Sequence, residues 1–249
     1  QQMILGIDAG GTHPRFVLMD NLGNIVHESI KDSLHFMKVG FDGIEKSLND
    51  YKIEMNELGY EADKFKVAIG MAGYGNDPKI RKGIEDSVYA VFPEAILYND
   101  AQFALISALN GEDGVFVISG TGSIALRKDG EDFTRSGGFG YLIDDGGSGF
   151  WIGKQILEAF VYQVDNRHPK TELYDEIMKI LDLEDPYQII QKVMSNQDDY
   201  RNFVANISGQ TAHLNDSVLD KIYVSAGLKL AELAKSFIIE EKTAITIGG

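Results

Sequence analysis

The chain has 249 residues, of which 44% are hydrophobic and 24% are charged, which predicts a globular protein with room for two medium-sized cores. Its 23 basic and 38 acidic residues give a net charge of −15, with the acids scattered along the chain, which argues against a nucleic-acid partner. Cysteine is absent, which excludes disulfides, thiol nucleophiles and cysteine-ligated zinc or iron–sulfur clusters. No apolar run approaches the ~18 residues of a membrane span, so we expect a cytoplasmic protein with no membrane partner.

The first predicted strand ends in a glycine turn that carries a carboxylate. Residues 4–7 form a short, β-branched run typical of a buried strand, and Asp8, Gly10, Gly11 and Thr12 follow it. Paired glycines let the backbone approach a ligand closely. A carboxylate beside bare amides can hold a hydrated metal ion while the amides face phosphate oxygens. An ordinary β-turn with a surface aspartate explains the same residues, so this motif alone leaves both readings open.

Three strands and then alternating helices and strands are predicted for the first 110 residues. The strands are expected at 4–7, 15–20, 25–30, 66–71 and 95–98, and the helices at 44–58, 78–91 and 101–109. Residues 32–40 read as irregular. Asn99 and Asp100 lead into the last of these helices, where Asp100 could serve as a helix N-cap.

The opening pattern begins again about 110 residues later. A buried strand at 115–119 is followed by a glycine turn at 120–123, a return strand at 124–127 and a hairpin turn at 129–130. The repetition predicts two α/β domains, residues 1–110 and 111–249, with a ligand site in the cleft between them.

A glycine-dense stretch at 137–149 precedes a predicted helix at 150–164. Free amides at such a helix start would suit an anion, although a capped flexible loop explains the stretch as well. Helices at 174–181, 187–194 and 200–207 read as a helical insertion. A longer helix at 217–239 and a strand at 243–247 complete the pattern.

Five segments in this order resemble the actin-like sugar-kinase superfamily, in the branch that contains N-acetylglucosamine kinase, archaeal hexokinase and the BadF/BadG/BcrA/BcrD ATPases. They are the first phosphate loop at 8–12, the general-base segment at 99–101, the second phosphate loop at 120–123, a glycine block at 138–153 and the start of the adenosine motif at 247–249. The resemblance implies two ribonuclease-H-like (actin-like ATPase) domains, the second with the helical insertion. It also implies that the family continues past the adenosine motif, so we expect the natural protein to extend beyond Gly249.

The resemblance assigns roles by position. Asp8 would bind Mg²⁺ through water, and Asp100 would act as the general base. Phosphate contacts of ATP would come from Gly10, Gly11, Thr12, Gly120, Thr121, Gly122 and Ser123, adenosine contacts from Gly248 and Gly249, and sugar contacts from His35, Lys38, Gly73, Asn99, Asp100, Gly138 and Asp145.

Two departures from the family pattern affect these roles. His13 and Pro14 replace the usual Lys-Thr pair, which removes a hydroxyl and a backbone donor near the phosphates, and Gly146 replaces an acid of the glycine block. Lys38 and the lost acid both favour an anionic substrate. A sugar acid such as 2-keto-3-deoxygluconate therefore stays beside a neutral hexose or N-acetylhexosamine as the expected substrate, and a solvated Lys38 is the plainer alternative.

The resemblance implies an ATP-dependent carbohydrate kinase, which transfers the γ-phosphoryl group of MgATP to a hydroxyl of a sugar. A sugar- or nucleotide-binding sensor of the same fold that has lost turnover is one alternative, motivated by His13, Pro14 and Gly146. An activator-type ATPase is another, although it would lack the cysteine-ligated cluster that is usual for that type. The sequence leaves the number of subunits open, a homodimer included.

Overall fold

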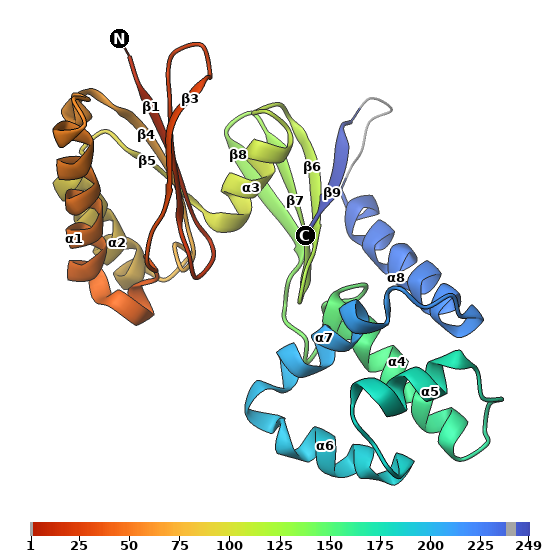
Figure 1. Ribbon diagram of the computed structural model, residues 1–249. Helices are drawn as coiled ribbons and strands as arrows, with labels where there is room; N and C mark the ends of the chain where they lie inside the picture. The colour runs from red at the N-terminus through yellow and green to blue at the C-terminus, as the bar shows by residue number, and fades with distance from the viewer. Residues whose placement is uncertain (1, 238–242) are drawn as a thin grey trace. The chain divides into compact units, whose positions relative to one another are not determined.

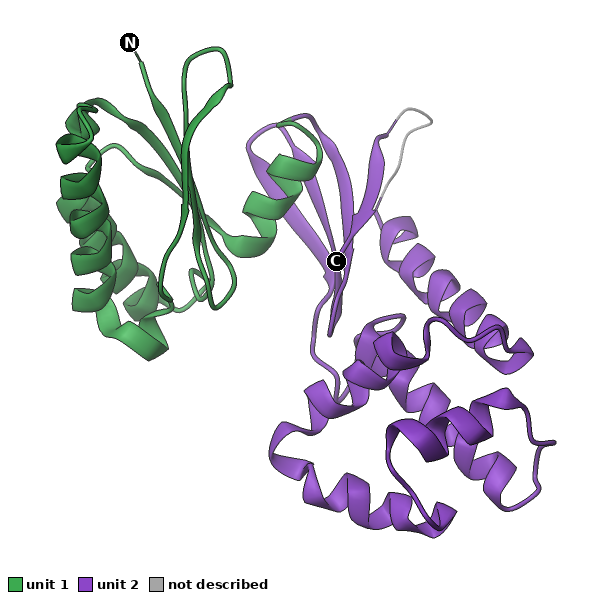
Figure 2. Cartoon of the chain, in the orientation of Figure 1, with its two compact units in different colours: residues 1–111 green, residues 112–249 purple. Residues whose placement is uncertain are grey.

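The computed structural model describes residues 2–237 and 243–249. The chain divides into two compact units, residues 1–111 and 112–249 (Figure 2). Each unit contains one sheet, and the two sheets share a strand order, β3-β2-β1-β4 in unit 1 and β8-β7-β6-β9 in unit 2. The internal repeat expected from the sequence is therefore a repeat of sheet topology.

Unit 1 is built on a five-stranded sheet, with the order β3-β2-β1-β4-β5. Its first three strands form an antiparallel meander, and β4 and β5 continue the sheet in parallel with β1 (Figure 1). The elements of this unit are β1 (Ile4–Ala9), β2 (Arg15–Met19), β3 (Ile25–Ile30), α1 (Phe36–Glu57), β4 (Lys66–Met71), α2 (Pro78–Val91), β5 (Ile96–Asn99) and α3 (Asp100–Ala108), with a short 3₁₀ turn at Ala62–Lys64.

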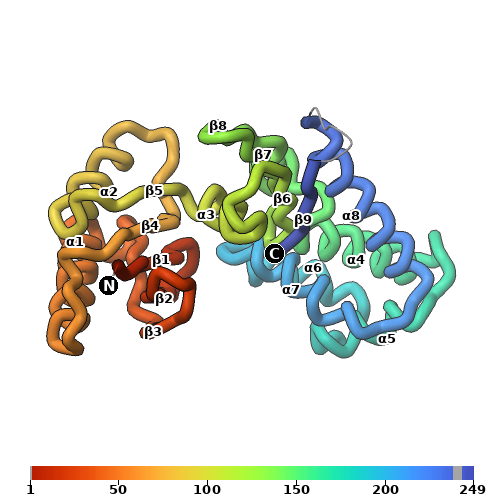
Figure 3. Tube along the Cα trace, turned by 90° about the horizontal axis from the view of Figure 1, so that it is seen from above, coloured from red at the N-terminus to blue at the C-terminus, as the bar shows by residue number. Residues whose placement is uncertain are grey.

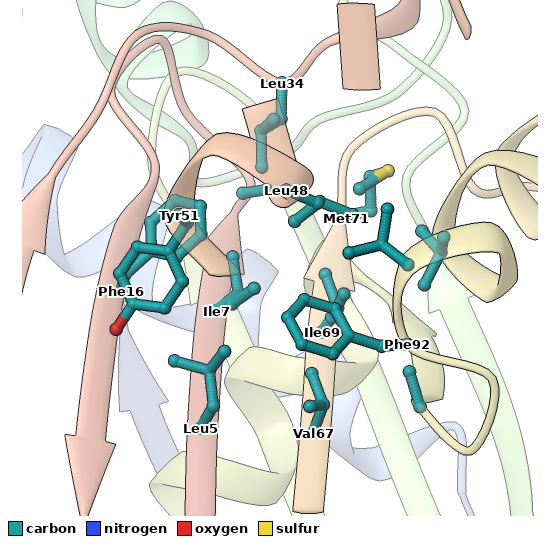
Figure 4. Packing of buried hydrophobic residues seen from close by; sticks show 14 of the residues in the cluster. Leu5, Ile7, Phe16, Leu34, Leu48, Tyr51, Val67, Ile69, Met71 and Phe92 are labelled. Carbon is teal, nitrogen blue, oxygen red and sulfur yellow. The ribbon is translucent and has the colours of Figure 1, made fainter. Parts of the chain in front are cut away.

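The core of unit 1 lies between one face of this sheet and the helices α1 and α2 (Figures 1 and 4). Leu5 and Ile7 of β1 and Ile69 of β4 point into it, and Leu48 and Tyr51 of α1 meet them from the helix side. Since side chains alternate along a strand, the residues between them face the other way. That opposite face carries Asp8 of β1, and α3 packs against β1, β4 and β5.

The start of α1 differs from the prediction. Residues 32–40 were expected to be irregular, but Phe36–Val39 form a helical turn. Gly40, with φ 70° and ψ 175°, then breaks the helix before it continues to Glu57. This conformation lies in a region that essentially only glycine adopts, so Gly40 sets the angle between the first turn and the rest of the helix.

Unit 2 combines a four-stranded sheet with five helices among its described residues. Three antiparallel strands are joined by β9, which runs parallel to β6. The elements are β6 (Gly114–Ser119), β7 (Ser123–Asp129), β8 (Asp132–Gly137), α4 (Gly149–Val164), α5 (Glu172–Ile180), α6 (Ile189–Ser195), α7 (Tyr200–Thr211), α8 (Ser217–Lys235) and β9 (Ile245–Gly248), with 3₁₀ turns at Pro186–Gln188 and Gln197–Asp199.

The predicted helical insertion is present and has its own core. Side chains of α4, α5 and α7 such as Phe160, Ile177 and Val204 are fully buried together, and α4 packs along α7. The helix α8 lies along the sheet of this unit (Figures 1 and 3). It was predicted to reach residue 239, but it ends at Lys235, and residues 238–242 lie outside the described residues. No helix among the described residues has both the length and the apolar character to cross a membrane.

We expect Asp216 to make the stability of unit 2 depend on pH. It is 4% exposed. Burial raises its pKa, but the Thr171 side chain and the amides of Val218, Leu173 and Leu219 donate to the carboxylate and together lower the pKa below its usual value. A lowered folded-state pKa gives stability that is present above the unfolded pKa of about 3.9 and is lost as the pH falls through the folded value.

The change Asp216→Ala should therefore lower the free energy of unfolding by about 2–3 kcal/mol at pH 7, because it removes a helix cap and leaves a buried amide unpaired. The loss should shrink below about pH 4, where the wild-type carboxyl also loses its charge. Urea unfolding at both pH values measures this. Asp220→Ala, an exposed acid in the same helix turn, is the control, and an equal loss at both pH values for Asp216→Ala would contradict the expectation.

The contact between α3 and the sheet should also be sensitive to a single methyl group. A Cβ added at Gly70 of β4 would overlap Phe103 of α3. We expect Gly70→Ala to lower the free energy of unfolding by about 1–3 kcal/mol through overpacking. Gly227→Ala in α8, where nothing lies within 4 Å of the new atom, should instead raise it by about 0.5–1 kcal/mol. Denaturant unfolding of both variants tests the contact, and similar values for the two would refute it.

Candidate functional site

The first glycine loop of unit 1, at Gly10, lies between the carboxylates of Asp8 and Asp100. A Cβ placed on Gly10 would lie 3.0 Å from the Cβ of Asp100, 3.5 Å from its Oδ2 and 3.4 Å from the Oδ1 of Asp8. The amide of Gly10 also donates to Asp8 Oδ1 at 3.2 Å. The two acids that the sequence singled out therefore meet at one glycine, and a side chain at that position would fill the space between them.

The capping role at the start of α3 belongs to Asn99. Its side chain accepts from the amide of Gln102 at 2.7 Å, and the Gln102 side chain accepts from the amide of Asn99 at 3.2 Å, which completes a capping box. Asp100 is the first residue of the helix, and its Oδ1 accepts from the amide of its neighbour Ala101. Since Asn99 caps the helix, the Asp100 carboxylate is left to point at the first glycine loop.

His35 and Gly73 lie together in unit 1. His35 caps α1, and its Nδ1 accepts from the amide of Met37 at 3.2 Å. A nitrogen that accepts carries no hydrogen, so this bond places the ring hydrogen on Nε2. Nε2 lies 3.8 Å from a Cβ placed on Gly73, which has φ 83° and whose added Cβ would also press on Phe36. The result is a ring donor directed at the loop that follows β4.

The remaining predicted residues of unit 1 are on the surface. Gly11, Thr12 and Lys38 are exposed, and Pro14 is buried. The carbonyl of Pro14 accepts from the amide of Lys31 at 3.0 Å, so Pro14, which departs from the family pattern, connects the first glycine loop to the end of β3.

Among the described residues, no three histidine, aspartate or glutamate side chains lie close enough together to hold a metal ion directly.

In unit 2 the start of α4 holds the second glycine loop. The sequence predicted free amides there, but Gly149 N–H donates to Gly120 O at 2.8 Å and Phe150 N–H donates to Thr121 O at 3.2 Å. Ser148 caps the helix by accepting from the amide of Trp151. Of the two readings of this helix start, the hydrogen bonds favour the capped loop over free amides for an anion, because loop carbonyls accept from the amides of Gly149 and Phe150.

Asp145 lies inside unit 2, beneath the same loop. It is 2% exposed, accepts from the amide of Ser123 at 3.3 Å and pairs with Arg201 of α7 at 3.4 Å. Ser123 is also buried, and its hydroxyl donates to the carbonyl of Gly146. Sequence reasoning missed Arg201, because a lone arginine within a predicted helix has no spacing that relates it to a distant glycine turn.

A pocket of about 460 Å³ adjoins the second glycine loop. One side comes from the loop and the start of α4, and the other from polar and small residues of α7. Its lining consists of Gly120, Thr121, Gly149, Ala205, Asn206, Ser208, Gly209 and Gln210.

The last predicted residues lie around this loop. Gly248 pairs with Ile118 in the sheet, and a Cβ on Gly249 would lie 3.1 Å from the amide nitrogen of Gly120. Gly138 has φ 75° and packs on Ile124. The segment assigned to adenosine is therefore next to the segment assigned to phosphate.

Comparison with known proteins gives the family and the relatives that the chain resembles in sequence. The sequence model of the BadF/BadG/BcrA/BcrD ATPase family matches residues 5–249. The chain is similar to an N-acetylmuramic acid/N-acetylglucosamine kinase from Clostridium acetobutylicum, with 28% identity across 98% of this chain and 79% of that protein. It is also similar to an N-acetyl-D-glucosamine kinase from Dictyostelium discoideum, with 30% identity across 96% of this chain and 80% of that protein.

A solved structure supports the fold. A candidate N-acetylglucosamine kinase from Chromobacterium violaceum superposes with a TM-score of 0.76 at 20% identity, covering 100% of this chain and 87% of that one. The predicted fold class, α/β with two actin-like units and a helical insertion in the second, is confirmed.

Asp145 offers a direct test of how the second loop is held. We expect Asp145→Ala to lower the free energy of unfolding by about 2–4 kcal/mol, because it leaves a buried amide unpaired and places alanine at a positive φ of 66°. Asp145→Asn keeps an acceptor and tolerates that backbone, so it should restore at least half of the loss. Denaturant unfolding measures both variants, and equal losses would show that the carboxylate oxygen does not hold the loop.

Proposed function

The chain belongs to the BadF/BadG/BcrA/BcrD ATPase family, and we propose that it is an ATP-dependent sugar kinase whose acceptor is a hydroxyl of an N-acetylhexosamine. The observation that carries the proposal is the meeting of Asp8, Gly10 and Asp100 in unit 1. A kinase of this type needs a base for the acceptor and a carboxylate near the phosphates, and both are within reach of one glycine.

Asp100 is proposed as the general base. A sugar hydroxyl is a weak nucleophile, and a positioned carboxylate that takes its proton contributes roughly 10²- to 10⁴-fold to the rate. The Oδ2 of Asp100 faces Gly10, while its Oδ1 is oriented by the amide of Ala101. The bond to Ala101 limits rotation of the carboxylate, so that one oxygen remains directed at the acceptor.

The groups around Gly10 fit MgATP, which would supply the phosphoryl group when bound. The missing side chain at Gly10 leaves space between two carboxylates that a Cβ would fill. Asp8 would hold Mg²⁺ through water, and the amides of the exposed Gly11 and Thr12 would contact phosphate oxygens. The amide of Gly10 already donates to Asp8 and that of Gly120 to the carbonyl of Gly122, so neither is a free donor for phosphate. Gly122 and Ser123 complete the second loop.

The nucleoside is proposed to occupy the pocket beside the second loop. Its volume of about 460 Å³ lies within the range usual for small-molecule sites. Ala205 and Gly209 of α7 leave room for a flat base, and Asn206 and Gln210 offer amide groups for hydrogen bonds. Gly249 lies next to the amide of Gly120, and Gly248 pairs with Ile118 in the sheet.

The sugar is proposed to contact unit 1 near His35, Gly73 and Asn99. Asp145 does not fit a sugar contact, because it is 2% exposed and its carboxylate already binds the Ser123 amide and Arg201. The Nε2–H of His35 is a neutral donor suited to a hydroxyl or an amide carbonyl of the sugar. Lys38 is exposed, and it would decide whether a carboxylate on the sugar is tolerated. A sensor without turnover remains the second candidate, because His13 and Pro14 replace the usual pair of residues after the first loop.

The substrate class is tested by ADP release with MgATP. The panel is N-acetylglucosamine, glucosamine, N-acetylmuramic acid, glucose and 2-keto-3-deoxygluconate. We expect the highest kcat/KM with a neutral N-acetylhexosamine. Turnover confined to the acids would make Lys38 the first residue to mutate, and calorimetric binding of a sugar with no ADP release would favour the sensor.

The base is tested by Asp100→Asn. We expect kcat to fall by at least about a hundredfold while the calorimetric affinity for the sugar changes by less than about twofold, because the amide keeps the shape but takes no proton. Asp86→Asn, on the exposed side of α2, is the matched control and should be unaffected. Near-normal turnover by Asp100→Asn would remove Asp100 from this role.

A further inference from the structure

Hydrogen bonds among three polar side chains connect the loop that follows β4 to α2. They are Tyr74 of the loop and Arg81 and Glu85 of α2. The hydroxyl of Tyr74 donates to Glu85 Oε1 at 2.6 Å and accepts from Arg81 Nη2 at 2.8 Å. Arg81 Nη1 also donates to the carbonyl of Gly75 at 3.3 Å, and its guanidinium lies 4.1 Å from the centre of the Tyr74 ring. One arginine therefore holds both the side chain and the backbone of this loop.

The same loop links the two parts of unit 1 that the proposed function assigns to substrates. The amide of Ala72 donates to the carbonyl of Ala9 at 3.1 Å, immediately before the first glycine loop. On the other side, Gly73 lies against Phe36 and beside Nε2 of His35. A shift of residues 72–75 would therefore change the distance from His35 to the first glycine loop.

The hydroxyl of Tyr74 is suited to this connecting position. The residue is 6% exposed. Burial and the hydrogen bond to Glu85 raise the pKa of Tyr74 to about 12, so the hydroxyl keeps its proton and can donate and accept at once. Both of its partners are charged, and hydrogen bonds to charged groups are the stronger ones. The ring already packs in the core of unit 1, so the hydroxyl is not needed to fill space.

We propose that Tyr74, Arg81 and Glu85 are positioning residues, which hold the loop at residues 72–75 in the shape that receives the acceptor sugar beside His35. The inference rests on the proposed function and adds three residues that contact neither substrate. Their effect should appear in sugar affinity while leaving the chemical step almost unchanged.

The test is Tyr74→Phe, which keeps the ring and removes both hydrogen bonds of the hydroxyl. We expect KM for the sugar to rise by about fivefold to thirtyfold, with kcat within about twofold and KM for ATP unchanged, since one buried hydrogen-bonded group is lost. Calorimetric affinity for the same sugar should fall by the same factor. Tyr89→Phe, on α2 and 39% exposed, is the matched control and should match the wild type.

Two further variants separate positioning from general stability. Glu85→Gln keeps an acceptor for the Tyr74 hydroxyl and should retain most of the sugar affinity, whereas Glu85→Leu should behave like Tyr74→Phe. Amide hydrogen exchange at residues 72–75 should speed up at least about tenfold in Tyr74→Phe and not in Tyr89→Phe. This readout needs no substrate, so it reports on the loop even if the sugar has been wrongly identified.

The outcomes distinguish this inference from the proposed function. Wild-type turnover together with unchanged sugar affinity in Tyr74→Phe would overturn the positioning role and leave the kinase proposal standing. A wild-type protein that neither binds nor phosphorylates any sugar would overturn the proposed function and the sugar role of these residues with it. Unchanged exchange at residues 72–75 would overturn the connection itself.

Discussion

The close approach of α3 to the sheet of unit 1 determines where the candidate base lies. Gly70 has no side chain, so Phe103 rests directly on the backbone of β4. Phe103 lies one helical turn beyond Asp100, and its contact with β4 therefore fixes the first turn of α3 against β1. Gly10 then meets Asp100 so closely that a Cβ at this position would lie 3.0 Å from the Cβ of Asp100, tighter than most Cβ contacts. Two missing side chains, at Gly70 and Gly10, thus create the space between the carboxylates of Asp8 and Asp100.

The second glycine loop is held by a different means. Asp145 has a φ of 66°, a left-handed conformation that aspartate adopts more readily than most residues with a Cβ. Its buried carboxylate binds the amide of Ser123 and pairs with Arg201. The first amides of α4 donate to the carbonyls of Gly120 and Thr121. The loop is therefore fixed from inside unit 2, and only Gly120 and Thr121 remain exposed at the pocket.

Sequence reasoning predicted the strands other than β8, the repeat and the positions of both glycine turns because those features depend on local pattern. The run at residues 66–71 and the helix at 78–91 match β4 and α2 residue for residue. It could not predict that Asn99, and not Asp100, caps α3, since either side chain suits that position. It also missed Arg201 and the trio around Tyr74. These contacts join residues on different elements, and their spacing in the sequence carries no signal of their distance in space.

Lys38 and the acid missing at Gly146 favoured an anionic sugar in the sequence, and each has an explanation within its own unit. Lys38 is exposed, in the first turn of α1. A Cβ on Gly146 would lie 3.2 Å from the Lys229 side chain, so this glycine lets α8 pack closely on the loop. His35, whose Nδ1 accepts from the amide of Met37, offers a donor without requiring a charge on its partner. Neither Lys38 nor Gly146 therefore requires a negative charge on the sugar.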